Sequence, residues 1–296
     1  MAKQANPLTG YVSQLSRHLS RSLRQSSEDS GAAPVHQARV ATRRLGSVVD
    51  LVQPWLRKSR HRKIQERLRE LRRRLAGIRD LDVMLGRLKQ YRGEHAGAVR
   101  WLEEQLQEQR SKARKKLTRF RRTDQWRGAE LAKALGKSRS RIGPALSKTI
   151  RRNFNHFSKS ADALVKSGRH RRRRLTDVHE LRISGKEIRY TLEFTAAIGA
   201  RLPKQIGQRL KQIQDELGAW HDRVVLAQRA MKLAAKRELA MENSTLLGAV
   251  LKLVNVITAD AAAEIEAFVA SWRNVREQIS TAVRELCSET LRKGTE

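Results

Sequence analysis

The sequence HQARVATRRL at residues 36–45 has a counterpart, HELRISGKEIRY, at residues 179–190. Each copy begins with a histidine and places one basic residue three positions later and another seven positions later. A second pair of segments follows in the same order, GIRDLDV at residues 77–83 and AWHDRVV at residues 219–225. Their aspartates follow the two histidines at nearly the same interval. Matched segments in matched order indicate an internal duplication.

The spacing within each copy predicts a cationic stripe on one helix face. At about 100° per residue, positions 0, 3, 7 and 10 fall within an arc of roughly 80°. The second copy therefore predicts a stripe of His179, Arg182, Lys186 and Arg189, and the first copy predicts one of His36, Arg39 and Arg43. Apolar residues lie on both sides of the second stripe, which favours a cleft over open water. The alternative is a half-buried helix whose basic side chains reach past the core to solvent.

Composition and periodicity predict an all-α fold in two related halves, residues 1–125 and 126–296. Only 5 Trp, 3 Tyr, 5 Phe and 5 Pro are present, which argues against a sandwich or barrel. Apolar residues recur at helical spacing throughout. The expected helices cover residues 8–26, 34–53, 58–91, 94–121, a short piece to 135, 143–166, 177–198, 203–239 and 245–291. We also consider a break in the last helix near Thr258 or Trp272.

The charge balance points to a polyanionic partner. The chain has 63 Lys and Arg against 30 Asp and Glu, a formal net charge of +33. Such a charge repels itself unless a polyanion is bound. Cys287 is the only cysteine, which fits a reducing compartment. The start of the sequence lacks an apolar signal core, and no stretch approaches about 18 uncharged apolar residues. We therefore expect a cytoplasmic protein without membrane insertion.

These duplicated motifs resemble the CHAD domain family, the conserved histidine α-helical domain. The resemblance lies in VHQARVATRRL at 35–45, IRDLDV at 78–83, VHELRI with KEIRY between 178 and 190, and the Leu217–Gly218 and His221–Asp222 pairs. It implies two pseudo-symmetric antiparallel helical bundles around a central basic channel that binds inorganic polyphosphate. The second aspartate motif departs from the pattern, because Arg223 stands at the position of Leu81 and Val224 at that of Asp82.

A chain of phosphates requires a track of basic groups, with arginine able to fork onto two oxygens. The two stripes provide that track if the halves pack face to face, and the resemblance places both histidines in the channel. The full set of candidate polyphosphate-binding residues is His36, Arg39, Arg43, Arg44, Arg69, Arg72, Arg79, His179, Arg182, Lys186, Arg189, Tyr190, Lys211 and His221. We expect Asp80 and Asp222 to hold the arginines in place. The alternatives are a solvated face for the arginines of residues 58–91 and neutral histidines at helix contacts.

Two other functions are compatible with parts of the sequence. Nucleic-acid binding is the main alternative, because it gives the same basic composition. Aromatic residues on which bases could stack are scarce near the stripes, however. A metal-dependent phosphohydrolase is a minor alternative that His179, His221 and Asp222 suggest by residue type, but no acidic cluster accompanies them. We therefore expect a binding protein without catalysis, metal or cofactor, which polyphosphate granules could recruit.

Overall fold

The structure is a computed structural model that describes residues 7–28, 31–120, 131–132, 142–166, 171–197, 199, 204–236, 239, 241 and 243–293. In these ranges the regular structure is helical throughout, which confirms the all-α prediction. The α-helices are α1 (Pro7–Glu28), α2 (Ala33–Leu51), α3 (Lys58–Leu88), α4 (Ala96–Phe120), α6 (Ile142–Lys166), α7 (Arg171–Ala197), α8 (Lys204–Ala234) and α10 (Ser244–Lys293). Two 3-10 turns, η1 (Gln53–Trp55) and η2 (Lys89–Tyr91), follow α2 and α3.

Local sequence explains where several helices begin and end. Pro34 lies in the first turn of α2, where its missing N–H leaves no hydrogen bond unmade. Pro54 falls in η1, just after α2 ends. The last helix, in contrast, is one continuous helix of 50 residues, so the break considered near Thr258 or Trp272 is wrong. Trp272 is fully buried and stacks on Phe268, which anchors this part of α10 in the core without interrupting it.

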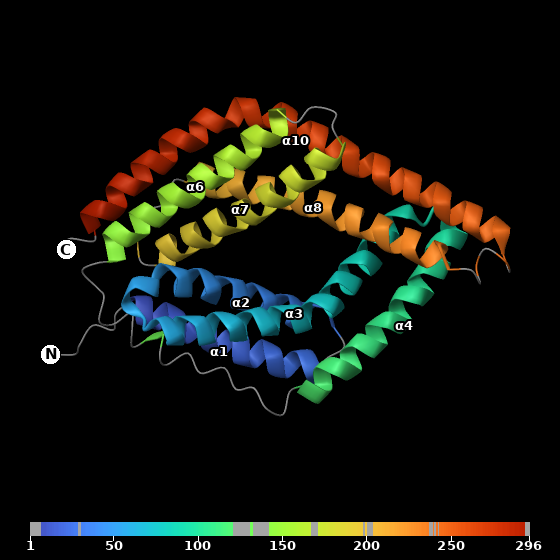
Figure 1. The fold of residues 1–296 in the computed structure, drawn as a ribbon, viewed down its shortest axis with the longest axis horizontal. Helices are drawn as coiled ribbons and strands as arrows, with labels where there is room; N and C mark the ends of the chain where they lie inside the picture. Colours follow the sequence, from blue (N-terminus) through green and yellow to red (C-terminus); the bar gives the residue numbers. More distant parts are fainter. Residues whose placement is uncertain are drawn as a thin grey trace.

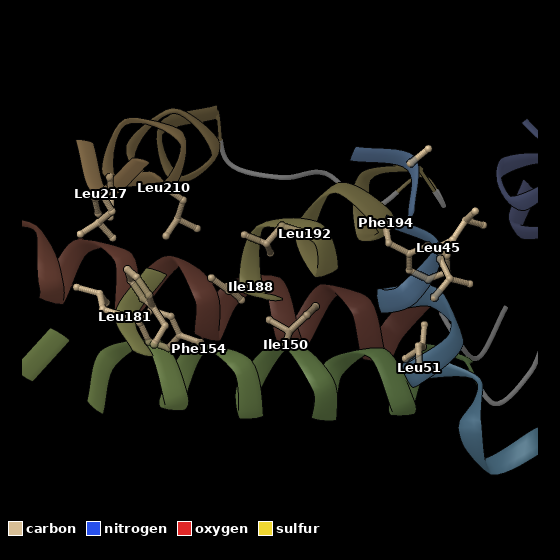
Figure 2. Close-up of a cluster of buried hydrophobic side chains, with 14 of the residues drawn as sticks. Leu45, Leu51, Ile150, Phe154, Leu181, Ile188, Leu192, Phe194, Leu210 and Leu217 are labelled. Atoms are coloured by element: carbon tan, nitrogen blue, oxygen red, sulfur yellow. The ribbon is translucent and has the colours of Figure 1, made fainter. Parts of the chain in front are cut away.

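The apolar faces of the helices form two cores. The larger core joins α1, α2, α6 and α7 with parts of α3, α8 and α10. Figure 2 shows one section of it, with Leu45 and Leu51 from α2, Ile150 and Phe154 from α6, four residues of α7, and Leu210 and Leu217 from α8. The smaller core joins α4 with the remaining parts of α3, α8 and α10. Burial of these side chains is the main source of stability.

The two cores share the three longest helices, which run between them (Figure 1). Each core therefore contains residues from before and after the expected boundary at 125/126. That boundary falls within residues 121–130, outside the described residues, and the division into halves stays a prediction, as does the duplication itself.

One segment, Ser244–Ser288 in α10, is long and apolar enough to cross a membrane by length and composition. Core helices of soluble proteins meet the same criterion. Helix α10 packs along α8, α6 and α4, and in Figure 1 it bows over the length of the molecule. This helix does not indicate membrane insertion.

Candidate anion-binding site

The two predicted stripes come together because α2 packs against α7 (Figure 1). Lys186 on α7 shows this most clearly. Burial, together with the positive charges of Arg182 on its own helix and of Arg43 and Arg39 on α2, lowers the pKa of its ammonium group to about 6. A side chain of α7 therefore lies within the field of the α2 stripe.

Close helix packing positions Lys186. The preceding residue, Gly185, is buried against two neighbouring helices, and a Cβ atom there would collide with Gln214 of α8 and press on Phe157 of α6. Glycine thus permits α7 to approach both helices. The same approach leaves Lys186 half-buried, beside Arg182 on the inner face of its helix.

Helix α3 adds two more cations to the stripes. Burial, followed by the charges of Arg43 and Arg69, lowers the pKa of Arg72, and burial also lowers the pKa of Arg79. Arg39 reaches across from α2 and donates a hydrogen bond from Nη1 to the main-chain oxygen of Arg72 at 3.4 Å. We call the six residues on these three helices the central cluster: Arg39, Arg43, Arg72, Arg79, Arg182 and Lys186. Arg43 acts on the pKa of each of the other five members.

Asp80 and Asp222 lie close to the central cluster, and their expected role in holding its arginines stays a prediction. Asp222 raises the pKa of Arg79 and of Arg182, opposing the effect of burial. Its Oδ2 atom also lies 4.0 Å from Nη2 of Arg87, a contact that the sequence did not suggest. Asp80 raises the pKa of Arg39. The two carboxylates leave the central cluster with a net positive charge.

Glu193 is the main element that the sequence analysis missed. Its carboxylate accepts one hydrogen bond from Arg44 Nε at 2.7 Å and one from Arg189 Nε at 2.9 Å. Burial lowers the pKa of Arg44, but the hydrogen bond and the charge of Glu193 outweigh it and raise the pKa overall. Glu193 therefore joins α2 to α7 and fixes two of the predicted binding residues. Only the Nε atom of each guanidinium bonds to this carboxylate.

The histidines differ in their surroundings. His36 is exposed but near the central cluster, and burial together with the charges of Arg79 and Arg43 lowers its pKa. His221 is half-buried, and burial and Arg182 lower its pKa although Asp222 opposes them. His179 is exposed on α7, and no hydrogen bond or ion pair joins it to another described residue. Its role in the channel stays a prediction.

The remaining candidates lie around the central cluster. Tyr190 is buried, and it acts on the pKa of Arg44, Arg72 and Arg182, so its hydroxyl lies among these arginines. Arg69 on α3 and Lys211 on α8 are exposed. Solvated faces explain their placement as well as ligand binding does, and their assignment stays a prediction.

One buried donor of the site, Nε of Arg182, has no hydrogen-bond partner among the described residues. A buried donor left without a partner costs about 1–3 kcal/mol. An oxygen atom of an anion beside α7 would satisfy it. Nδ1 of His221 lies 3.5 Å from Oδ1 of Asp222, and this contact opposes the lowering of the His221 pKa. Among the described residues, no group of three His, Cys, Asp or Glu side chains is placed to hold a metal ion.

The aspartate motifs differ in the two halves, as their sequences indicate. Asp82 on α3 accepts a hydrogen bond from Arg110 Nε of α4 at 2.5 Å, and its side chain is almost fully buried. Its counterpart, Val224, has no carboxylate. Arg223 instead pairs with Glu264 of α10 and donates from Nε to the hydroxyl of Tyr91 at 3.2 Å. Both motifs therefore connect helices, but with opposite charges.

Comparison with known proteins identifies the fold. Residues 8–231 match the family described as CHAD domain. The crystal structure of the CHAD domain from the plant Ricinus communis is similar, with a TM-score of 0.65 and 21% sequence identity over 91% of this chain and 94% of that chain. PptA from Streptomyces chartreusis is also similar, with a TM-score of 0.61 and 17% identity over 95% of this chain and 99% of that chain. At these identities the similarity shows a shared fold. No match was found among curated proteins.

Proposed function

The chain belongs to the CHAD domain family, and from this premise we propose that it binds inorganic polyphosphate along the facing stripes of α2 and α7. The observation that carries the proposal is the convergence of Arg39 and Arg43 of α2 on Lys186 of α7. Such an arrangement of like charges is unfavourable in the empty protein. A polyanion between the helices would neutralise it.

The chemistry of the central cluster suits a chain of phosphates. Its arginines offer planar forks that can each contact two phosphate oxygens, while Lys186 offers a compact charge. The Nε atom of Arg182, which has no partner among the described residues, supplies a further donor, and His221 lies beside it on α8. Because these groups come from α2, α3, α7 and α8, a ligand that contacts all of them must be extended or branched. Linear polyphosphate satisfies this requirement with a repeating charge.

We infer that the protein binds this ligand without transforming it. CHAD domains are generally binding domains. The central cluster consists of cations that would repel a metal ion, and among the described residues no three His, Cys, Asp or Glu side chains are placed to hold one. A binding module of this kind would be recruited to polyphosphate granules in the cytoplasm, and this localisation is part of the proposal.

Nucleic acid is the competing ligand, and a competition titration distinguishes the two. Labelled long-chain polyphosphate is bound at about 150 mM salt, where weak charge contacts are partly screened. It is then challenged with single-stranded DNA, RNA and duplex DNA at equal phosphate concentration. We expect polyphosphate to persist against an excess of each, because Tyr190 is buried and offers no open platform for bases. Displacement of polyphosphate by a nucleic acid at equal phosphate concentration would show that the protein binds polyanions in general and does not prefer polyphosphate.

A further inference from the structure

A cleft of about 840 Å³ lies between α3, α4 and α8, beside the central cluster. Most of its polar wall is cationic, with contributions from Arg73, Arg74, Lys112, Lys116, Arg229 and Lys232. Asp80 is the single carboxylate in the lining. Leu81, Met84 and Val225 form the floor together with other apolar side chains. The cleft therefore combines room for a ligand with a positive wall on each of its three sides.

Some of these cations have partners and others do not. Arg73 and Arg74 pair with Glu70 of their own helix, and Lys112 pairs with Glu108 at 2.5 Å. Arg229 donates a hydrogen bond to Gln109 across the cleft. Lys116 on α4 and Lys232 on α8 are exposed and form no ion pair with any other described residue. Two free ammonium groups thus face the cleft from opposite walls.

The cleft is continuous with the central cluster along α8. His221, Val225, Gln228 and Lys232 follow one another at intervals of four, three and four residues, which places them on one helix face. His221 lies in the field of Arg182 and Lys186, and the other three residues line the cleft. A ligand can therefore follow α8 from one region into the other.

Helix α3, like α8, connects the cleft with the central cluster. Asp80 lines the cleft and also acts on the pKa of Arg39 and of Arg182, both members of the central cluster. Arg73 precedes Asp80 by two helical turns on the cleft side, while Arg72 turns toward Arg43. Asp80 therefore marks the boundary between the two basic regions, and cations continue on both sides of it.

We propose that this cleft is a second binding segment for the same polyphosphate chain, entered from the central cluster past Asp80. The inference rests on the proposed function and adds to it a preference for long polyphosphate chains. A chain too short to extend beyond the central cluster gains nothing from Lys116 and Lys232. A long chain gains both contacts, so the protein selects polyphosphate by length.

The test uses the full chain with two lysines replaced, Lys116→Gln with Lys232→Gln. The matched control is Lys148→Gln with Lys159→Gln, which removes the same charge from exposed positions on α6. Binding of labelled long-chain polyphosphate and of tripolyphosphate is measured over a range of salt concentrations. All four lysines are exposed, so equal thermal unfolding midpoints confirm that the variants remain folded.

The cleft variant should lose about tenfold in affinity for the long chain, as expected when contacts worth about 1.4 kcal/mol are removed. Its slope of log K against log salt should fall by about 1.4, the effect of two phosphate contacts on a single-stranded polyanion. The affinity of the cleft variant for tripolyphosphate should stay within about twofold of that of the unmodified protein. The control variant should bind both ligands within the same limit, since single exposed charges contribute little.

Two results would overturn the inference while leaving the proposed function intact. One is a cleft variant that binds the long chain as well as the control does. The other is an equal loss for tripolyphosphate and the long chain. If the unmodified protein binds neither ligand, the proposed function itself is wrong and the inference falls with it.

Discussion

The central cluster and the surroundings of Arg223 both hold arginine side chains partly away from bulk water. They differ in whether the neighbouring charges repel or attract the guanidinium group. In the central cluster, cations from α2, α3 and α7 face one another, and burial with neighbouring charges lowers the pKa of Lys186 to about 6. Around Arg223, carboxylates of α10 face the guanidinium. Burial lowers the pKa of Arg223, but Tyr91 and Glu264 outweigh it and raise the pKa overall.

The difference separates a structural role from a binding role. Arg223 joins α8 to η2 and α10, since Tyr91 also donates a hydrogen bond to Asp260 at 2.8 Å. Each cation there has an oppositely charged partner within the fold. In the central cluster, six half-buried cations outnumber the carboxylates close by, which include Asp80 and Asp222. On this account, the excess of cations marks the proposed polyanion site, whereas the paired cation serves the stability of the fold.

The largest expected effect comes from removing opposite members of the central cluster, Arg39→Gln with Arg182→Gln. Polyphosphate affinity should fall at least about 100-fold, because two charge-assisted contacts of about 1.5–3 kcal/mol each are lost. The control is again Lys148→Gln with Lys159→Gln, and titration of labelled polyphosphate measures both. Without ligand the cluster variant should be no less stable than the unmodified protein, since like charges are removed. Equal losses of affinity in the cluster variant and the control would show that the central cluster is not the binding site.

The reverse pattern is expected for Arg223→Ala. Loss of this guanidinium leaves Glu264 and Asp260 without their cation, which should reduce the free energy of unfolding by about 1.5–3 kcal/mol. The exposed pair of Arg100 with Glu104 provides the control, and Arg100→Ala should cost less than about 1 kcal/mol. Urea denaturation measures both. Polyphosphate affinity should not change, and a large loss of affinity in Arg223→Ala would place that residue in the binding site instead.

The smallest expected effect is a pH dependence of binding. In the empty protein Lys186 faces Arg182 on α7, Arg43 and Arg39 on α2, and Asp222 on α8, with a pKa of about 6. Bound phosphate would raise that pKa, so the group takes up a proton on binding above pH 6. Affinity is therefore greatest below pH 6 and should fall as pH rises toward 8, with a slope of at most about tenfold per pH unit for this one group. His36 and His221, whose pKa values are also lowered, contribute in the same direction.

Lys186→Met isolates this contribution. The variant keeps a flexible side chain of similar length but has no proton to gain. Its affinity at pH 6 should be lower than that of the unmodified protein, and its pH dependence should be shallower. An unchanged slope would assign the pH dependence to other groups.

Local spacing predicted much of the fold and the core of the site. The stripes follow from helical periodicity, and packing of α2 against α7 brings Arg39, Arg43, Arg182 and Lys186 together. Sequence did not reveal Glu193, because its bond to Arg44 joins residues 149 positions apart. The sequence also did not predict the cleft between α3, α4 and α8, because each of its walls comes from a different helix. Continuity of α10 was also missed, because the break considered near Thr258 or Trp272 does not occur: Trp272 packs in the core against Phe268 within one unbroken helix.

The most direct test of the account is the pKa of the Lys186 ammonium group, measured by NMR with and without long-chain polyphosphate. The facing stripes predict a pKa of about 6 in the free protein and a rise toward the ordinary lysine value when the ligand is bound. Arg43→Gln should raise the value in the free protein, because it removes one of the opposing charges. An ordinary lysine pKa in the free protein, or one that polyphosphate leaves unchanged, would contradict the account.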